Sequence, residues 1–322
     1  MKSPALPAPR RLLLPALVLP ALLLATPAAA PAQGAGAQGA PAARALAALR
    51  PVLEARIARH RGVVGVALLD PRTGESLSVR GDAPFPSASV IKVPILVEVF
   101  QQVEKGKLRL HDPLVLLEAD KVPGAGVLQF LHAPLELTVR DAAILMIILS
   151  DNTATNLLID KVGIRAVDAR MDTLGLPQTR LHAKVFRGRT TMIDSAAYEK
   201  YGLGVTTPDD MARLLAMIYR GEAVSDDASR QMVEILKAQM KDDRIPRYLP
   251  EGTVVANKTG ELNEVKHDCG IVYARARDYV LCIMTRDNAD RRWVLDNEAL
   301  LLGADLSRLV HEYLTATPPG RP

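Results

Sequence analysis

The sequence predicts an α/β fold (an α+β sandwich) in which both ends of the chain contribute to one sheet. Strand patterns occur at residues 63–80 and return at residues 253–285, whereas residues 107–240 are mostly helical in pattern. Strands at both ends with helices between them indicate a sheet assembled from the termini, with a helical insertion in the middle.

The first half of the chain supplies a helix, a hairpin and a second helix. Residues 42–61 are amphipathic, and Gly62 should end that helix. Residues 63–70 and 75–80 are separated by the turn signal Pro71-Arg72-Thr73-Gly74, which predicts a β-hairpin. The apolar run that follows Ser89 predicts a buried helix.

The second half carries clear helix starts. Thr138 and Asp141 form a capping box ahead of the apolar run 142–149, which should lie at the centre of a domain. Thr207 is a cap followed by Pro208 and two acidic residues, the order typical of a helix N-terminus. The remaining elements are strands at 253–258, 270–274 and 279–285, and a closing helix at 293–313.

The first 32 residues match an export signal. They contain a basic start, an apolar core at 12–24 and the small-residue cleavage site Ala30-Pro31-Ala32. The core is too short and too interrupted by proline to span a bilayer, so we expect no stable membrane anchor after cleavage. The mature protein should be periplasmic or secreted, and residues 33–43 should be a disordered lead-in.

Charge and composition exclude several classes of function. The formal net charge of +4 falls to +1 once Lys2, Arg10 and Arg11 leave with the signal, so nucleic-acid binding is not indicated. No Cys/His group has the spacing of metal ligands. Residues 44–316 should form one domain, with an α/β part at 44–86 and 247–316 and a helical part at 87–246.

The two cysteines, Cys269 and Cys282, fall on strands that we expect to pair. Export permits a disulfide between them. Because the register of the strands is not fixed by the sequence, we favour two buried free thiols and leave the disulfide open.

Ser89 and Lys92 form the first chemical motif. On a helix, residues three apart share a face, so hydroxyl and amine should point the same way. A buried, neutral amine can take the proton of a serine and turn it into a nucleophile. Taken alone, the pair could equally be a helix cap and a solvated amine, because Ser-x-x-Lys occurs about once by chance in a chain of ordinary composition.

Two further tripeptides strengthen the interpretation of Ser89 and Lys92 as a catalytic pair. Ser150-Asp151-Asn152 lies at the end of the predicted buried helix, and Lys258-Thr259-Gly260 closes the strand predicted at 253–258. Each could be structural by itself, as a loop or a strand end. In this order, the three motifs form the pattern of class A β-lactamases and penicillin-binding proteins.

The chain therefore resembles the class A β-lactamase branch of the penicillin-recognising serine hydrolases. The likeness extends to residues 123–129, 150–158 and 206–208. It implies a five-stranded antiparallel sheet flanked by N- and C-terminal helices plus an all-helical domain, with the site in the cleft between them. It implies no cofactor, because nucleophile, base and oxyanion donors all come from the chain.

The resemblance assigns the acylation chemistry to three side chains. Ser89 attacks the carbonyl of a β-lactam or of a D-Ala-D-Ala-like peptide, and Lys92 accepts or relays its proton. Ser150 passes a proton toward the leaving nitrogen. The backbone N–H groups of Ser89 and Glu261 would form the oxyanion hole, where one donor contributes about 3 kcal/mol.

The resemblance also implies a set of substrate-binding residues: Asn152, Lys258, Thr259, Gly260, Glu261 and Arg244. Asn152 would hold the side-chain amide of the substrate. Lys258 and Thr259 would face its carboxylate. Arg244 stands where some relatives keep a carboxylate-binding arginine, although it could simply be surface charge.

One departure from the family bears on function. The family places a Glu-x-x-Leu-Asn segment after Ser-Asp-Asn, and its Glu activates the deacylating water. Here the segment 179–187 has Val185 or Phe186 in that place. Asp194 or Glu199 could substitute, but either could also be an exposed loop carboxylate. Without a positioned base, hydrolysis of the acyl-enzyme slows by about 10²–10⁴-fold.

Three hypotheses follow from these residues. The protein could be a β-lactamase-type hydrolase, which we rank first, or a D-Ala-D-Ala peptidase or esterase of the same fold. It could also be a penicillin- or cell-wall-peptide-binding protein that does not turn over. In each case the partner is a small β-lactam or cell-wall peptide, and we expect a monomer.

Overall fold

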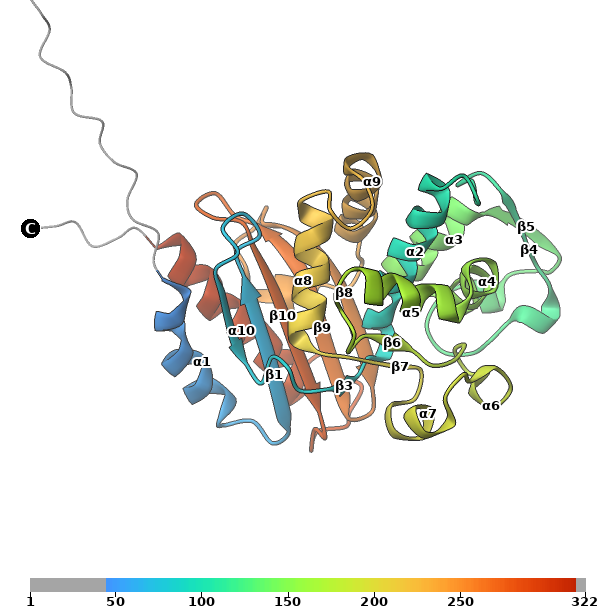
Figure 1. Cartoon of the computed structure of the whole chain (residues 1–322). Helices are drawn as coiled ribbons and strands as arrows, with labels where there is room; N and C mark the ends of the chain where they lie inside the picture. The colour runs from blue at the N-terminus through green and yellow to red at the C-terminus, as the bar shows by residue number, and fades with distance from the viewer. Residues whose placement is uncertain (1–44, 317–322) are drawn as a thin grey trace, which may run out of the picture. The chain divides into compact units, whose positions relative to one another are not determined.

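A five-stranded antiparallel sheet forms the centre of the computed structural model, which describes residues 45–316 (Figure 1). The strand order is β2-β1-β10-β9-β8. The strands are β1 Val63–Leu69, β2 Ser76–Val79, β8 Val254–Leu262, β9 Val265–Tyr273 and β10 Tyr279–Arg286. This confirms the predicted fold class, with a sheet built from both ends of the chain. The predicted export signal and lead-in lie outside the described residues.

Hydrophobic clusters cover both faces of this sheet. On one face, α1 (Arg50–Ile57) and α10 (Glu298–Thr315) pack against the strands, together with the short turns η1 (Leu46–Leu49) and η5 (Ile245–Tyr248). On the other face, α8 (Pro208–Tyr219) crosses the sheet, as Figure 1 shows. The larger cluster on this second face continues into the helical part of the molecule.

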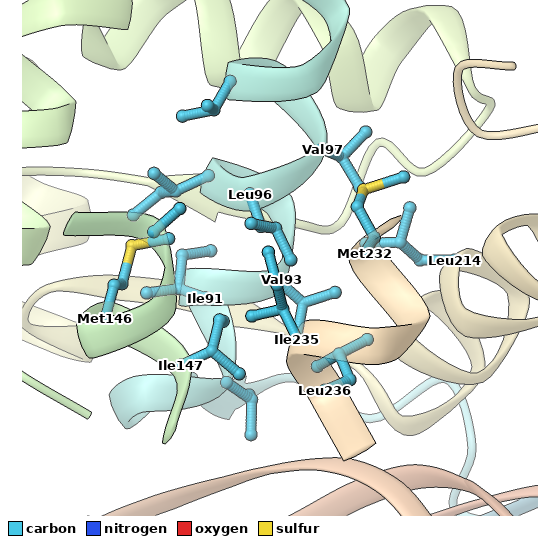
Figure 2. Packing of buried hydrophobic residues seen from close by; sticks show 14 of the residues in the cluster. Ile91, Val93, Leu96, Val97, Met146, Ile147, Leu214, Met232, Ile235 and Leu236 are labelled. Carbon is cyan, nitrogen blue, oxygen red and sulfur yellow. The ribbon is translucent and has the colours of Figure 1, made fainter. Parts of the chain in front are cut away.

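The helical part is built around α2, whose residues from Lys92 to Gln101 are all buried. Its sequence is apolar on every side, which is typical of a helix at the centre of a domain. Figure 2 shows Ile91, Val93, Leu96 and Val97 among side chains from three other helices. Those partners are Met146 and Ile147 of α3, Leu214 of α8, and Met232, Ile235 and Leu236 of α9.

The remaining elements connect these layers. The helices are α2 Lys92–Glu104, α3 Val139–Ile148, α4 Asn152–Val162, α5 Ile164–Thr173, α6 Gly188–Thr191, α7 Ser195–Tyr201 and α9 Asp226–Lys237. The short helical turns are η2 Ala88–Ile91, η3 Glu118–Asp120 and η4 Leu128–Phe130. Two small sheets are formed by β3 Phe85–Pro86, β6 Arg180–Leu181 and β7 Gly204–Thr206, and by β4 Pro113–Leu116 and β5 Leu135–Thr138.

The predicted helix starts are confirmed. The Thr138 hydroxyl accepts from the Asp141 N–H at 3.1 Å, and the Asp141 carboxylate accepts from the Thr138 N–H at 2.9 Å. Thr207 caps α8 by accepting from the Asp210 N–H at 3.1 Å. The apolar run 142–149 buries one face fully rather than all sides, since four of its eight residues are only partly covered.

Two strand boundaries differ from the sequence prediction. β8 continues to Leu262, so Lys258-Thr259-Gly260 lies inside the strand instead of closing it. β9 begins at Val265 rather than residue 270. The reason is that buried polar residues occupy this hairpin and hide the apolar pattern of a strand.

Two other predictions need correction. The last helix begins at Glu298, five residues later than predicted, because the Asn297 side chain caps it. Cys269 and Cys282 are register partners on β9 and β10, and the structure joins them in a disulfide. The preference for free thiols was therefore wrong, because the sequence could not supply the register.

The turns at one end of the sheet are tied together by Arg277. Its guanidinium pairs with Asp70 at 2.5 Å and with Glu75 at 2.6 Å. Asp70 is 4% exposed and also accepts the backbone N–H groups of Arg72 and Thr73. A charge this well buried is stable only when it is paired.

We predict that Arg277→Ala lowers the free energy of unfolding by about 2 kcal/mol, because Asp70 loses its counter-charge. Urea denaturation should show a lower midpoint with an unchanged slope. Arg275→Ala, which removes an exposed arginine two residues away, should change stability by less than about 0.5 kcal/mol. Equal effects of the two substitutions would contradict a specific role for the Arg277 pairs.

Candidate active site

Ser89 lies in the short turn η2 that opens α2. The Lys92 N–H donates to the Ser89 carbonyl, so the two residues are one turn apart, as the motif predicted. The preceding residue, Ala88, has a φ of 44°, a left-handed conformation that costs energy for a residue with a Cβ. Ser89 is partly exposed, and its hydroxyl makes no hydrogen bond within residues 45–316.

A buried histidine fixes the chain that leads to Ser89. His267 on β9 is fully buried and lies 2.8 Å through Nε2 from the Pro86 carbonyl. Its Nδ1 accepts the Thr285 N–H at 3.1 Å, so Nε2 carries the proton and donates. Burial lowers the pKa of His267 to about 4, which keeps the ring neutral. The sequence analysis missed this residue, whose partner is 181 positions away.

The edge strand β8 passes directly beside Ser89. A Cβ on Gly260 would lie 3.1 Å from the Ser87 carbonyl oxygen and 3.2 Å from the Ser89 nitrogen. Only glycine permits this approach without a shift of one backbone. Gly260 therefore acts through the absence of a side chain, which brings the free edge of β8 against the serine.

Lys92 is fully buried and reaches across to the second motif. Its Nζ donates to the Ser150 carbonyl at 2.6 Å, to the Ser150 hydroxyl at 3.1 Å and to the Asn152 side-chain oxygen at 3.0 Å. Burial lowers the pKa of Lys92 to about 7, and the charge of Asp151 opposes that shift. An amine in this range can lose its proton near neutrality and serve as a base.

Ser150 stands between two lysines. Its hydroxyl lies 3.1 Å from Lys92 Nζ and 3.1 Å from Lys258 Nζ. Lys258 is also fully buried, and burial, followed by the charge of Lys92, lowers its pKa well below the usual value. Ser150 itself has a φ of 56°, so the turn between α3 and α4 is strained at this residue.

The other members of the second motif hold the neighbouring loop. Asp151 caps α4 and also accepts the Val127 N–H at 2.7 Å and the Leu128 N–H at 2.9 Å. The Asn152 amide donates to the Pro123 carbonyl at 3.0 Å while its oxygen accepts from Lys92. The loop 123–129, which the sequence analysis singled out, is thus fastened to Ser-Asp-Asn.

Thr259, Glu261 and Arg244 lie on the far side of β8 from Lys258. Residues alternate along a strand, so Thr259 and Glu261 share the face opposite Lys258. Thr259 is 3% exposed and Arg244 is 2% exposed. Arg244 pairs with Glu261 at 3.0 Å and with Asp243 at 3.1 Å, so its charge is already compensated within the chain.

The segment 179–187, in which the sequence predicts no glutamate at the family position, is well fixed at Val185. The Val185 N–H donates to the Asn156 oxygen at 2.8 Å, and the Asn156 amide donates to the Val185 carbonyl at 2.9 Å. Phe186 has a φ of 53°, is 65% exposed and approaches Gly124. Asn156 was not predicted as a site residue, although it lies in the family-like run 150–158.

The two carboxylates proposed as substitutes lie elsewhere. Asp194 is exposed and caps α7 by accepting the Ala197 N–H at 2.9 Å. Glu199 is exposed on the same helix. Within residues 45–316, neither makes a hydrogen bond or ion pair with a residue of the three motifs.

The part of the chain that the structure describes offers no alternative chemistry. It contains no group of three or more His, Cys, Asp or Glu that could hold a metal ion. Nor does it contain a helix both long and apolar enough to cross a membrane.

Two β-lactamases are similar to this chain in sequence. A β-lactamase from Rhodobacter capsulatus is 27% identical over 80% of this chain and 85% of its own length. Beta-lactamase L2 from Stenotrophomonas maltophilia is 31% identical over 66% of this chain and 69% of its own length.

Solved structures show the same likeness. A β-lactamase from Sphaerobacter thermophilus has a TM-score of 0.74 and 34% identity, covering 85% of this chain and 99% of its own. PBP-A has a TM-score of 0.70 and 29% identity, covering 84% and 97% of the two chains. The sequence model of the β-lactamase enzyme family matches residues 47–314. The chain therefore belongs to the β-lactamase enzyme family, among the serine hydrolases of the class A type.

Proposed function

We propose that this protein is an exported serine hydrolase that is acylated at Ser89 by β-lactams and opens their cyclic amide. The observation that carries the proposal is the Ser150 hydroxyl, held at 3.1 Å from each of two fully buried lysine amines. Burying two amines costs free energy and is hard to explain without chemistry. The export signal predicted in residues 1–32 supports a periplasmic or secreted location.

In this proposal the first half of the reaction uses only groups of the chain. Neutral Lys92 takes the Ser89 proton as the hydroxyl oxygen attacks the carbonyl carbon. The oxyanion is held by the N–H groups of Ser89 and Glu261, an assignment that the close approach of Gly260 to the Ser89 nitrogen supports. The leaving nitrogen receives a proton through Ser150, and Lys258 holds the substrate carboxylate.

The second half should be slow. Hydrolysis of the acyl-enzyme needs a base to activate water. By the family resemblance Val185 or Phe186 stands where the glutamate would be, and Asp194 and Glu199 are committed or exposed elsewhere. A similar chain, a point mutant of PBP-A with 29% identity, is described as an acyl-enzyme complex with penicillin G. That description supports covalent attachment of a penicillin to Ser89.

A second candidate function is favoured by the same missing glutamate. D-Ala-D-Ala peptidases and esterases of this fold do not need that residue, because the acyl group leaves by another route. A protein that binds penicillin or cell-wall peptide without turning over is the limiting case, in which the acyl group stays on Ser89.

The first prediction concerns the adduct itself. Mature protein mixed with benzylpenicillin should gain the mass of one penicillin, followed over time by intact-protein mass spectrometry. Because water is not activated, the adduct should form quickly and decay slowly. Ser89→Ala should form none. No adduct on the wild-type protein would contradict the proposed function, and an unchanged adduct on Ser89→Ala would remove Ser89 from the mechanism.

The second prediction concerns the missing base. Val185→Glu should shorten the lifetime of the adduct by about 10²-fold or more, because it supplies a carboxylate on a backbone that Asn156 already fixes. Val185→Gln has the same shape without a basic oxygen and should leave the lifetime unchanged. Equal lifetimes in the two variants would show that a base at this position does not limit deacylation.

The third prediction concerns pH. Lys92 must be neutral to accept the Ser89 proton, and its pKa of about 7 means that the neutral fraction grows as pH rises through neutrality. The acylation rate should rise about tenfold per unit below pH 6 and level off above about pH 8. Stopped samples between pH 5 and 9, analysed for adduct, give this profile.

Two arginine substitutions test which amine titrates. Lys92→Arg keeps the charge but cannot lose a proton, so acylation should fall by about 10²–10⁴-fold. Lys258→Arg places a permanent charge at the other position, and its acylation rate should still rise with pH. A rise that disappears only in Lys258→Arg would assign the base to Lys258 instead.

A further inference from the structure

Glu261 is surrounded by three cations from two segments of the chain, the loop between α9 and η5 and the strand β9. Its carboxylate lies 3.0 Å from Lys241 Nζ, 3.0 Å from an Arg244 Nη and 3.0 Å from Lys266 Nζ. We call these four residues the Glu261 cluster. The role assigned to Glu261 in the oxyanion hole needs only its backbone N–H. That role does not explain why the residue carries a carboxylate.

The cluster is well buried. The Glu261 side chain is 12% exposed, Arg244 is 2% exposed and the Lys266 side chain is 0% exposed. Only Lys241 reaches solvent, with 43% exposure. Burial raises the pKa of Glu261, but the charges of Arg244 and Lys241 outweigh it and hold the pKa at about 2. The carboxylate is therefore ionised at any pH at which the protein works.

The cluster acts on the site across β8, since the charges of Lys241 and Arg244 contribute to the lowered pKa of Lys258. Gly260, the neighbour of Glu261, is the residue whose approach to the Ser89 nitrogen admits no side chain. At the Lys241 end of the cluster, the Met240 N–H donates to the carbonyl of Ile148, the last residue of α3. Lys241 directly follows this contact, and Ile148 lies two residues before Ser150. A carbonyl bound at the Glu261 N–H would thus have the cluster beside it.

The surroundings of Arg244 indicate how the charge of the cluster would change without the Glu261 carboxylate. None of its three guanidinium nitrogens makes a hydrogen bond of good geometry within residues 45–316, although two ion pairs balance its charge. Guanidinium groups bind carboxylates readily and in a directed way. If the Glu261 charge were removed, Lys241, Arg244 and Lys266 would present uncompensated positive charge beside the bound substrate.

We propose that the Glu261 carboxylate determines charge specificity: it neutralises the cations of its cluster, so that the cleft favours substrates with one carboxylate over substrates with two. Lys258 is then the cation available to the single carboxylate. A second negative charge on the acyl part of the substrate meets a resident anion instead of free cations, which disfavours it. This inference rests on the proposed acylation at Ser89.

The test compares two penicillins that differ by one carboxylate on the acyl side chain. Benzylpenicillin carries one carboxylate and carbenicillin carries two. For each variant, the acylation rate constant is measured with both compounds by intact-protein mass spectrometry. The rate with carbenicillin divided by the rate with benzylpenicillin, the acylation ratio, cancels any general loss of activity.

Substitutions of opposite sign should move the acylation ratio in opposite directions. Glu261→Gln removes the resident anion and should raise the ratio about three- to tenfold, the effect of one charge near 10 Å in a partly shielded site. Lys241→Gln removes an exposed cation and should lower the ratio about threefold. Both shifts should shrink in 0.5 M salt.

Two control variants carry the same charge changes outside the cluster. Glu264→Gln lies in the turn of the same hairpin, where the carboxylate pairs with Arg291. Lys237→Gln lies on α9 and removes a pair with Glu234. Both should leave the acylation ratio within about twofold of wild type, because distant exposed charges are screened.

The outcomes separate the two proposals. If the wild-type protein forms no adduct with either penicillin, the proposed function fails and takes this inference with it. If the wild type is acylated but the ratio does not move in Glu261→Gln and Lys241→Gln, the inference alone is overturned. Should Glu261→Gln not fold, because Arg244 and Lys266 lose their counter-charge, Lys241→Gln decides the matter through its exposed position.

Discussion

The burial of two lysine amines on one serine hydroxyl is the constraint on which the rest of the site depends. Lys92 and Lys258 are fully buried, and both reach Ser150. Taking an amine out of water disfavours its charged form, which is why the pKa of each is lowered. The fold imposes the free-energy cost of burying the two amines by placing α2, the turn before α4 and β8 around the Ser150 hydroxyl. What it gains is an amine that can accept a proton near neutrality.

Keeping that geometry requires support from residues that touch no substrate. The Asp151 carboxylate fixes the turn at Ser150 and the loop 123–129 by accepting three N–H groups, one of which caps α4, and its charge opposes part of the effect of burial on Lys92. His267 holds the approach to Ser89 from the sheet. Such supporting contacts keep reacting groups within a few tenths of an ångström of productive positions. They also explain why polar residues are buried in β9.

The sequence predicted the fold class and the meeting of the three motifs, because the local signals are strong. The helix caps at Thr138 and Thr207 and the hairpin turn at residues 71–74 are each determined by interactions within four residues of sequence. The limits of β8 and β9, the disulfide and the role of His267 were missed. Each depends on register or on partners far along the chain, and local periodicity carries no information about either. Arg244 illustrates the same limit, since the motif placed the residue but not the acid it pairs with.

In the loop after Ser-Asp-Asn, the backbone is held in place independently of the side chain that it presents at residue 185. Asn156 binds both backbone groups of Val185, so the loop is held at one of the two residues where the family resemblance would place a glutamate. The backbone is thus ready for a water-activating side chain and presents a valine instead. Slow release of the acyl group would then be a property of one side chain, with the machinery for attaching it left intact.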